Sequence, residues 1–178
     1  MPLNDRRLHI TGIESLERIQ AIGFMAIFVA MMTLSMSPIW TKATAEVHYT
    51  LYPWALRGID SDGLIVHEKF SSYFYIGLLC VASALTSLYQ LARFDSRHAQ
   101  LGIGAINTII ITLTLWVGCH FGERLNSSIA PEIAGQYSEE FANAIIASFI
   151  SNALAALFIL RDERLIKTVG RLRRDLLS

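Results

Sequence analysis

The chain has 178 residues, of which 53% are hydrophobic and only 17% charged, and its mean hydropathy is +0.42. This is more apolar material than a soluble domain of that size needs to fill one core, so the composition indicates an integral membrane protein. The formal net charge is zero, which excludes a field over the whole molecule that recruits nucleic acid or an acidic substrate.

Four charge-free apolar runs divide the chain, and each is long enough to cross the hydrocarbon of a bilayer as a helix. The runs cover residues 19–39, 70–92, 99–119 and 141–160. They predict an all-α integral membrane fold, an antiparallel four-helix transmembrane bundle formed by one domain of residues 1–178. A multi-pass protein of this kind is expected in a plasma membrane or a bacterial inner membrane, with an organelle membrane as the alternative.

The first run has a predicted helix start before it and a long connection after it. Thr11 and Glu14 have the spacing of a capping box, so a helix is expected to begin there. In the connection of residues 41–69, the alternation over Val47–Tyr52 fits a short strand, and a segment lying on the membrane surface fits equally well. Residues of the turn-forming types occupy Asp60–Gly63, which predicts a turn.

Short polar segments determine how the later spans begin. The link of residues 93–97 is so short that the second and third spans must be antiparallel neighbours. Asp95 or Ser96 is expected to cap the third span, and Ser138 is expected to cap the fourth.

The C-terminal segment, residues 161–178, predicts an amphipathic helix with a narrow apolar stripe. Its basic face is expected to bind the anionic inner leaflet of the bilayer. The alternative is a solvated continuation of the fourth helix. The basic residues of this face are Arg164, Lys167, Arg171 and Arg174.

The distribution of Lys and Arg predicts the orientation of the bundle. The N-terminal segment, the short link and the C-terminal segment together hold eleven of these residues, whereas the two longer connections hold four. By the positive-inside rule, both termini are expected in the cytoplasm and the two longer connections outside.

Small and neutral polar residues inside the runs predict helix packing. We expect an interhelical hydrogen-bond cluster in the inner half of the bilayer, in which each bond contributes about 0.6 kcal/mol. The alternative role for this set is to bind a ligand or the helix of a partner. The set consists of Ser83, Ser87, Gly102, Gly104, Asn107, Ser148 and Asn152.

Histidine and glutamate residues gather at the predicted outer rim. His67 and Glu68 precede the second span, and His120 and Glu123 follow the third. Imidazoles and carboxylates in such a group can bind a divalent metal, and the two histidines alone suit haem ligation. A structural or solvated rim is the preferred interpretation, because no H-x-x-x-H or H-E-x-x-H pattern occurs. No cofactor is therefore expected, with haem or a divalent metal as the alternative.

The overall plan, with both ends inside and a long first outer connection, is similar to that of claudin-type tetraspans. The first outer connection lacks the G-L-W motif and the cysteine pair of that family. The resemblance therefore concerns architecture and implies no function.

The spans contain no charged residue, which argues against a proton-coupled transporter, a voltage sensor or a pump. No nucleophile elbow, phosphate loop or pair of buried carboxylates is present to support an enzyme. We therefore expect a non-enzymatic accessory, assembly or scaffold subunit that packs against a larger membrane complex. Its expected partners are other membrane-protein subunits or further copies of the chain. The alternatives are a redox protein that uses the rim histidines and an oligomeric pore or transporter subunit.

Overall fold

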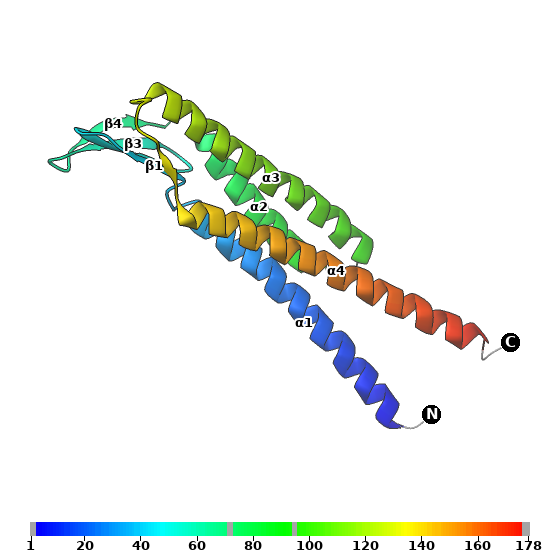
Figure 1. Cartoon of the computed structure of the whole chain (residues 1–178). Helices are drawn as coiled ribbons and strands as arrows, with labels where there is room; N and C mark the ends of the chain where they lie inside the picture. The colour runs from blue at the N-terminus through cyan, green and yellow to red at the C-terminus, as the bar shows by residue number, and fades with distance from the viewer. Residues whose placement is uncertain (1–2, 71–72, 94–95, 176–178) are drawn as a thin grey trace.

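The computed structural model describes the backbone of residues 3–70, 73–93 and 96–175, and the side chains of residues 18–70, 73–93, 96–161 and 164. Within these ranges, four helices run along one another and a sheet closes one end of them, whereas both termini lie at the opposite end (Figure 1). We call these the sheet end and the termini end. The helices are α1 (Leu3–Leu34), α2 (Phe74–Ala92), α3 (Arg97–Ser128) and α4 (Glu139–Asp175).

The all-α prediction is wrong, because the two connections at the sheet end form a five-stranded antiparallel sheet of order β4-β3-β2-β1-β5. Four strands come from the connection between α1 and α2. The fifth comes from the connection between α3 and α4 and pairs with β1. The strands are β1 (Trp40–Ala43), β2 (Val47–Leu51), β3 (Leu56–Asp60), β4 (Ile65–Lys69) and β5 (Gln136–Tyr137).

The two connections form a sheet for a simple physical reason. Backbone groups outside a helix need hydrogen-bond partners, and neighbouring segments of a connection supply them by pairing. The possible strand at Val47–Tyr52 is confirmed as β2. The turn at Asp60–Gly63 is also confirmed, because Gly63 has a φ of +78° and its N–H donates to the Asp60 carbonyl at 2.9 Å. Glycine adopts this left-handed conformation without strain, which lets β4 fold back onto β3.

Two predicted helix ends are also wrong. The first helix begins at Leu3, so the capping-box residue Thr11 lies inside α1 rather than at its start. The last helix continues to Asp175, so residues 161–175 prolong α4 instead of forming a separate amphipathic helix. No proline interrupts this segment, and the fourth helix simply propagates through it. The side chains of Lys167, Arg171 and Arg174 lie outside the described residues.

Two predicted caps are present. The Ala99 N–H donates to Ser96 Oγ at 3.4 Å at the start of α3, and the Phe141 N–H donates to Ser138 Oγ at 3.1 Å at the start of α4. Each hydroxyl satisfies one of the amides that a first helical turn leaves without a partner.

Three helices are long and apolar enough to cross a membrane: Phe74–Ala92, Arg97–Ser128 and the Glu139–Arg161 part of α4. The apolar part of α1, Arg18–Leu34, is shorter. The run predicted as the first span extends to residue 39, but the helix ends at Leu34 because the chain turns there and enters β1.

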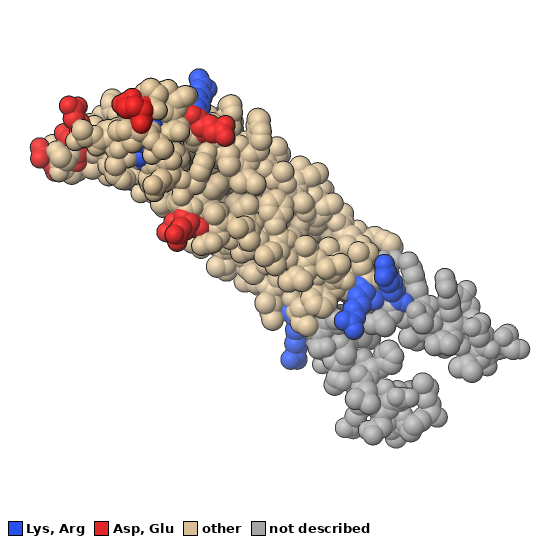
Figure 2. All heavy atoms as spheres, viewed as in Figure 1, with Lys and Arg blue, Asp and Glu red and all other residues tan. Residues whose placement is uncertain are grey.

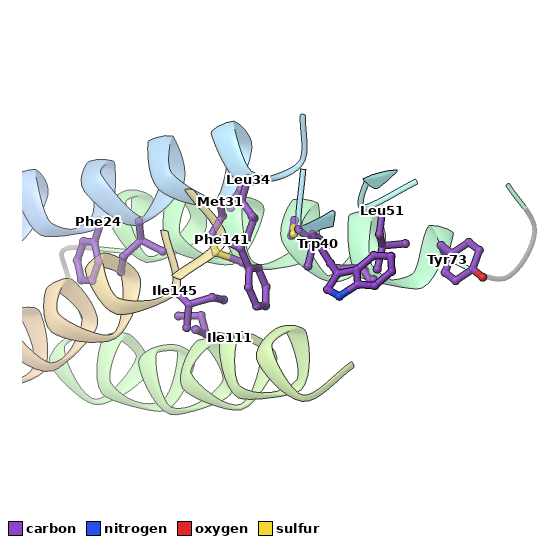
Figure 3. Close-up of a cluster of buried hydrophobic side chains, with 14 of the residues drawn as sticks. Phe24, Met31, Leu34, Trp40, Leu51, Tyr73, Ile111, Phe141 and Ile145 are labelled. Atoms are coloured by element: carbon purple, nitrogen blue, oxygen red, sulfur yellow. The ribbon is translucent and has the colours of Figure 1, made fainter. Parts of the chain in front are cut away.

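The core lies along the axis of the bundle and continues beneath the sheet (Figure 3). Phe24 and Met31 of α1 are buried between the helices, and Trp40 and Leu51 carry the core into the sheet. The outward faces of the helices are apolar as well. Several of their large side chains are more than 60% exposed, including Ile22, Trp116 and Leu157.

Trp54 attaches the sheet to two helices. Its indole Nε1 donates to the Ser35 carbonyl just after α1 at 2.6 Å, and its ring lies against Gly77 near the start of α2. The Gly77 N–H also donates to the Pro53 carbonyl at 3.0 Å. A Cβ at residue 77 would lie 2.5 Å from ring carbons of Trp54, so the close approach requires glycine. A Cβ at Gly102 of α3 would meet no atom within 4 Å.

We expect Gly77→Ala to lower the free energy of unfolding by about 1–3 kcal/mol, because the added methyl group displaces the indole ring of Trp54. The matched change Gly102→Ala is expected to be neutral or to stabilise the protein by up to about 1 kcal/mol, because alanine is the better helix former. Thermal unfolding in detergent, followed by tryptophan fluorescence, measures both variants. Equal stability of the two would contradict the seating of Trp54 on Gly77.

Candidate functional site

A buried lysine ties the sheet to the end of α3. Lys42 of β1 is only 2% exposed, and its ammonium group donates to the backbone carbonyl and to the side-chain Oδ1 of Asn126, both at 3.1 Å. Asn126 Oδ1 also accepts from the Gly135 N–H at 2.8 Å. A buried ammonium group is costly unless acceptors surround it. Asn126 therefore stabilises the junction of β1, α3 and the segment before β5.

Tyr137 attaches β5 to α3. Its hydroxyl donates to the Cys119 carbonyl at 3.0 Å. Burial first, and then the neighbouring Cys119 and Glu123, raise the pKa of Tyr137 to about 12. The hydroxyl therefore stays protonated and remains a hydrogen-bond donor across the physiological pH range.

The structure does not assemble the four predicted metal ligands into one group. His67 lies in β4, where its ring stacks on a tyrosine of β2 with 6.3 Å between centroids, and Glu68 pairs with Arg57 at 3.0 Å. His120 lies on α3, where its ring stacks on a tryptophan one turn earlier at 5.5 Å, and Glu123 is exposed. Among the described side chains, no group of three or more His, Cys, Asp and Glu residues could hold a metal ion.

Buried polar side chains from all four helices extend from the middle of the bundle toward the termini end. We call this set the polar seam, and each member is at most 6% exposed. The seam contains five of the seven residues that the sequence assigned to helix packing. Its members are Gln20 of α1; Ser83, Ser87 and Gln90 of α2; Gln100 and Asn107 of α3; and Ser148 and Asn152 of α4.

Hydrogen bonds of the seam join α2 to α3 at two levels. Ser83 Oγ donates to Asn107 Oδ1 at 2.7 Å. Closer to the termini end, the side-chain amide of Gln90 donates to the Gln100 backbone carbonyl at 3.1 Å, and that of Gln100 donates to the Gln90 carbonyl at 3.4 Å. Ser87 instead donates to a carbonyl of its own helix at 2.7 Å.

Asn152 joins α4 to α3. Its Nδ2 donates to the Gly104 carbonyl at 2.9 Å and to Thr108 Oγ1 at 2.7 Å. Gly104 also makes room for the side chain of Gln90, because a Cβ at residue 104 would lie 2.9 Å from Gln90 Nε2. Gly102 is exposed and lies against no other element, although the sequence assigned it to the same packing set.

Three glutamines of the seam were not among the predicted residues. Gln20, Gln90 and Gln100 each lie close to one end of a charge-free run, where a polar residue normally marks the membrane boundary. The sequence does contain a signal for Gln90, namely its helical spacing from two serines. Ser83, Ser87 and Gln90 are spaced four and three residues apart, which places them on one face of α2.

Charge separates the two ends of the molecule (Figure 2). Among the described side chains, the sheet end has eight acidic and four basic residues, whereas the termini end has five arginines and no acidic residue. The described side chains of the helical surface between the ends include no charged residue. The five arginines are Arg18, Arg93, Arg97, Arg161 and Arg164.

β4 forms an exposed edge of the sheet, and its apolar side chains lie at its start. It pairs with β3 on one side and is the last strand of the sheet on the other. All five of its residues are exposed. Leu64 is 66% exposed, Ile65 57% and Val66 47%. A sheet edge with apolar side chains and a row of backbone groups that meet no further strand of the described chain is a template for pairing with another chain.

These features define a class of protein, in which helices long and apolar enough to cross a membrane are closed at one end by an antiparallel sheet. Residues 16–172 match a family model described as a domain of unknown function, DUF4293. The match covers most of the chain, and the chain belongs to this family. No curated protein matches the sequence.

We expect Asn126→Ala to lower the free energy of unfolding by about 1–3 kcal/mol, because the Lys42 ammonium then stays buried with one acceptor fewer. The double variant Lys42→Met/Asn126→Ala is expected to lose less stability than the two single variants combined, because it leaves no unpaired buried charge. Thermal unfolding of the full chain in detergent measures all three variants. Strictly additive losses would mean that the two side chains do not stabilise each other.

Proposed function

We propose that the protein is a non-enzymatic, multi-pass membrane protein that acts as an accessory subunit and packs beside another membrane-protein subunit. The exposed edge strand β4, positioned just beyond the uncharged part of the bundle, is the observation that carries this proposal. Apolar side chains and unpaired backbone groups at a sheet edge are costly in water and are covered when a second extended segment pairs with them.

The charge pattern supports four spans with both termini in the cytoplasm. The uncharged helical surface matches a bilayer, and the arginine-rich termini end matches the cytoplasmic side. α1 is included as a span, because Arg18–Leu34 covers about 26 Å at 1.5 Å per residue, which is at the short end of what a membrane requires.

The proposed occupant of the β4 edge is an extended outer segment of a different membrane subunit. The described sheet end has twice as many acidic as basic residues, so two copies of this end repel each other. A neutral or basic segment does not meet this repulsion, and its apolar side chains can cover Leu64, Ile65 and Val66.

The topology is tested by labelling single cysteines in intact cells. A membrane-impermeant maleimide is expected to modify Ser61→Cys at the tip of the β3–β4 turn from outside. The same reagent is expected to modify Arg164→Cys only after the membrane is permeabilised. The chain without either substitution controls for its own cysteines, of which Cys80 is buried and Cys119 half-buried. Labelling of both sites from the same side would contradict the proposed orientation.

The docking edge is tested by site-specific photo-crosslinking in the native membrane. A photoreactive amino acid at Leu64 is expected to give one discrete crosslinked product with a second membrane protein, identified by mass spectrometry. The matched position Leu157 on α4 has similar exposure, 62% against 66%, and is expected to give no such product because lipid surrounds it.

The second half of this test introduces a charged residue into β4. Val66→Lys is expected to reduce the Leu64 product at least tenfold, because a buried lysine opposes strand pairing. Ile133→Lys, which lies just before β5 at the opposite edge of the sheet, is expected to leave the product intact. A product that contains only this chain, or that is equally strong in both variants, would overturn the proposed partner.

A further inference from the structure

Several buried polar atoms of the seam have no hydrogen-bond partner among the side chains and backbone that the structure describes. Such an atom in a protein interior costs about 1–3 kcal/mol, and native structures contain few of them. Here six occur within one set of neighbouring residues. They are Gln20 Nε2 and Oε1, Gln90 Oε1, Gln100 Oε1, Asn107 Nδ2 and Ser148 Oγ.

The three glutamines lie at one level of the bundle. Gln90 and Gln100 bond to each other's backbone across α2 and α3. A Cβ at Gly23 of α1 would lie 3.4 Å from the Ser151 carbonyl of α4, which places Gly23 at the level of the Asn152 contact. Gln20 lies three residues before Gly23, hence about one turn closer to the termini end. Three helices therefore contribute unpaired amide oxygens at one level of the bundle.

The remaining two atoms lie about two turns, roughly 10 Å, further toward the sheet end, because Asn107 follows Gln100 by seven residues on α3. Asn107 is adjacent to Thr108, which accepts from Asn152. Ser148 precedes Asn152 by four residues and so shares its helical face. The unpaired atoms thus follow the bundle axis rather than scattering over the molecule.

The kinds of atoms define the chemistry of an occupant. Three amide oxygens accept hydrogen bonds, two amide nitrogens donate, and the serine hydroxyl does both. A bound anion would leave the three amide oxygens without a donor, and a bound cation would leave the two amide nitrogens without an acceptor. Arg97, one turn before Gln100 on α3, adds a positive charge that further disfavours a cation. An uncharged molecule that both donates and accepts satisfies all of them.

We propose that the polar seam is a binding site for ordered water, which bridges α1 to the α2–α3 pair and joins Asn107 and Ser148 between α3 and α4. A water molecule makes two to four hydrogen bonds to buried polar groups of this kind. The proposal does not depend on a partner at the β4 edge, because every group involved belongs to the bundle.

The chain contains its own control for this site. Asn107 and Asn152 are the same residue type, are both buried, and lie in the same part of the bundle. Asn107 Nδ2 meets no acceptor in the described part of the chain, whereas Asn152 Nδ2 donates to both Gly104 and Thr108. Water must therefore contact the first amide and is not needed at the second.

The test is water-edited NMR of the full chain in lipid nanodiscs, read at the assigned side-chain amide protons. Magnetisation from water is expected to reach Gln20 and Asn107 at least threefold faster than it reaches Asn152. Replacing sodium by choline in the buffer is expected to leave the transfer unchanged. Absence of transfer to Gln20 and Asn107, equal transfer to Asn152, or loss of transfer without sodium would overturn the proposal.

A substitution gives an independent measurement. In a dry seam, Gln20→Met removes two unpaired polar atoms at nearly constant volume and raises the Tm. In a hydrated seam it removes bonds to water, and the Tm stays the same or falls. A raised Tm for Gln20→Met would overturn the proposal even if the NMR resonances of this side chain were not assigned.

Discussion

The sheet end depends on aromatic rings that lie directly against glycines. At each of these positions a Cβ would overlap the ring, so the two segments of each pair approach one another only because the glycine side chain is a hydrogen atom. The pairs are Trp54 on Gly77, Phe141 on Gly118, Tyr137 on Gly122 and Trp40 on Gly135. Because Trp54 anchors the first connection to α2 and Tyr137 anchors the second to α3, a strand of only two residues, β5, can extend the sheet built by the first connection.

In the half of the bundle toward the termini end, buried polar side chains rather than aromatic rings join the helices. Each interhelical hydrogen bond there contributes little to stability, about 0.6 kcal/mol. These hydrogen bonds matter more for the alignment of the helices than for their stability. Asn152 reaches both the Gly104 carbonyl and the Thr108 hydroxyl, and sliding α4 by one turn along α3 would break both bonds. Together with the packing of Phe141 on Gly118, these two bonds favour one axial register of α4 along α3.

The helices were predictable from the sequence because their signal is long: about twenty residues without a charge. The sheet was not, since its strands have five residues or fewer and only β2 shows a usable alternation. The seam was predictable at Asn107 and Asn152, which interrupt apolar runs, but not at Gln20 or Gln100, which resemble boundary residues. For the rim histidines, the sequence suggested a group that the structure does not form. His67 and His120 are close in the expected topology, yet each ring stacks on an aromatic neighbour of its own.

The unequal charge of the two ends has an electrical consequence. In a chain inserted as proposed, the eight acidic and four basic residues of the sheet end lie on one side of the membrane, whereas the rest of the sequence holds eleven basic and seven acidic residues on the other. A membrane potential that is negative inside favours this arrangement, at about 2.3 kcal/mol per elementary charge for every 100 mV. An energised membrane would therefore oppose inversion of the molecule, and the orientation would be most weakly held in a membrane whose potential has collapsed.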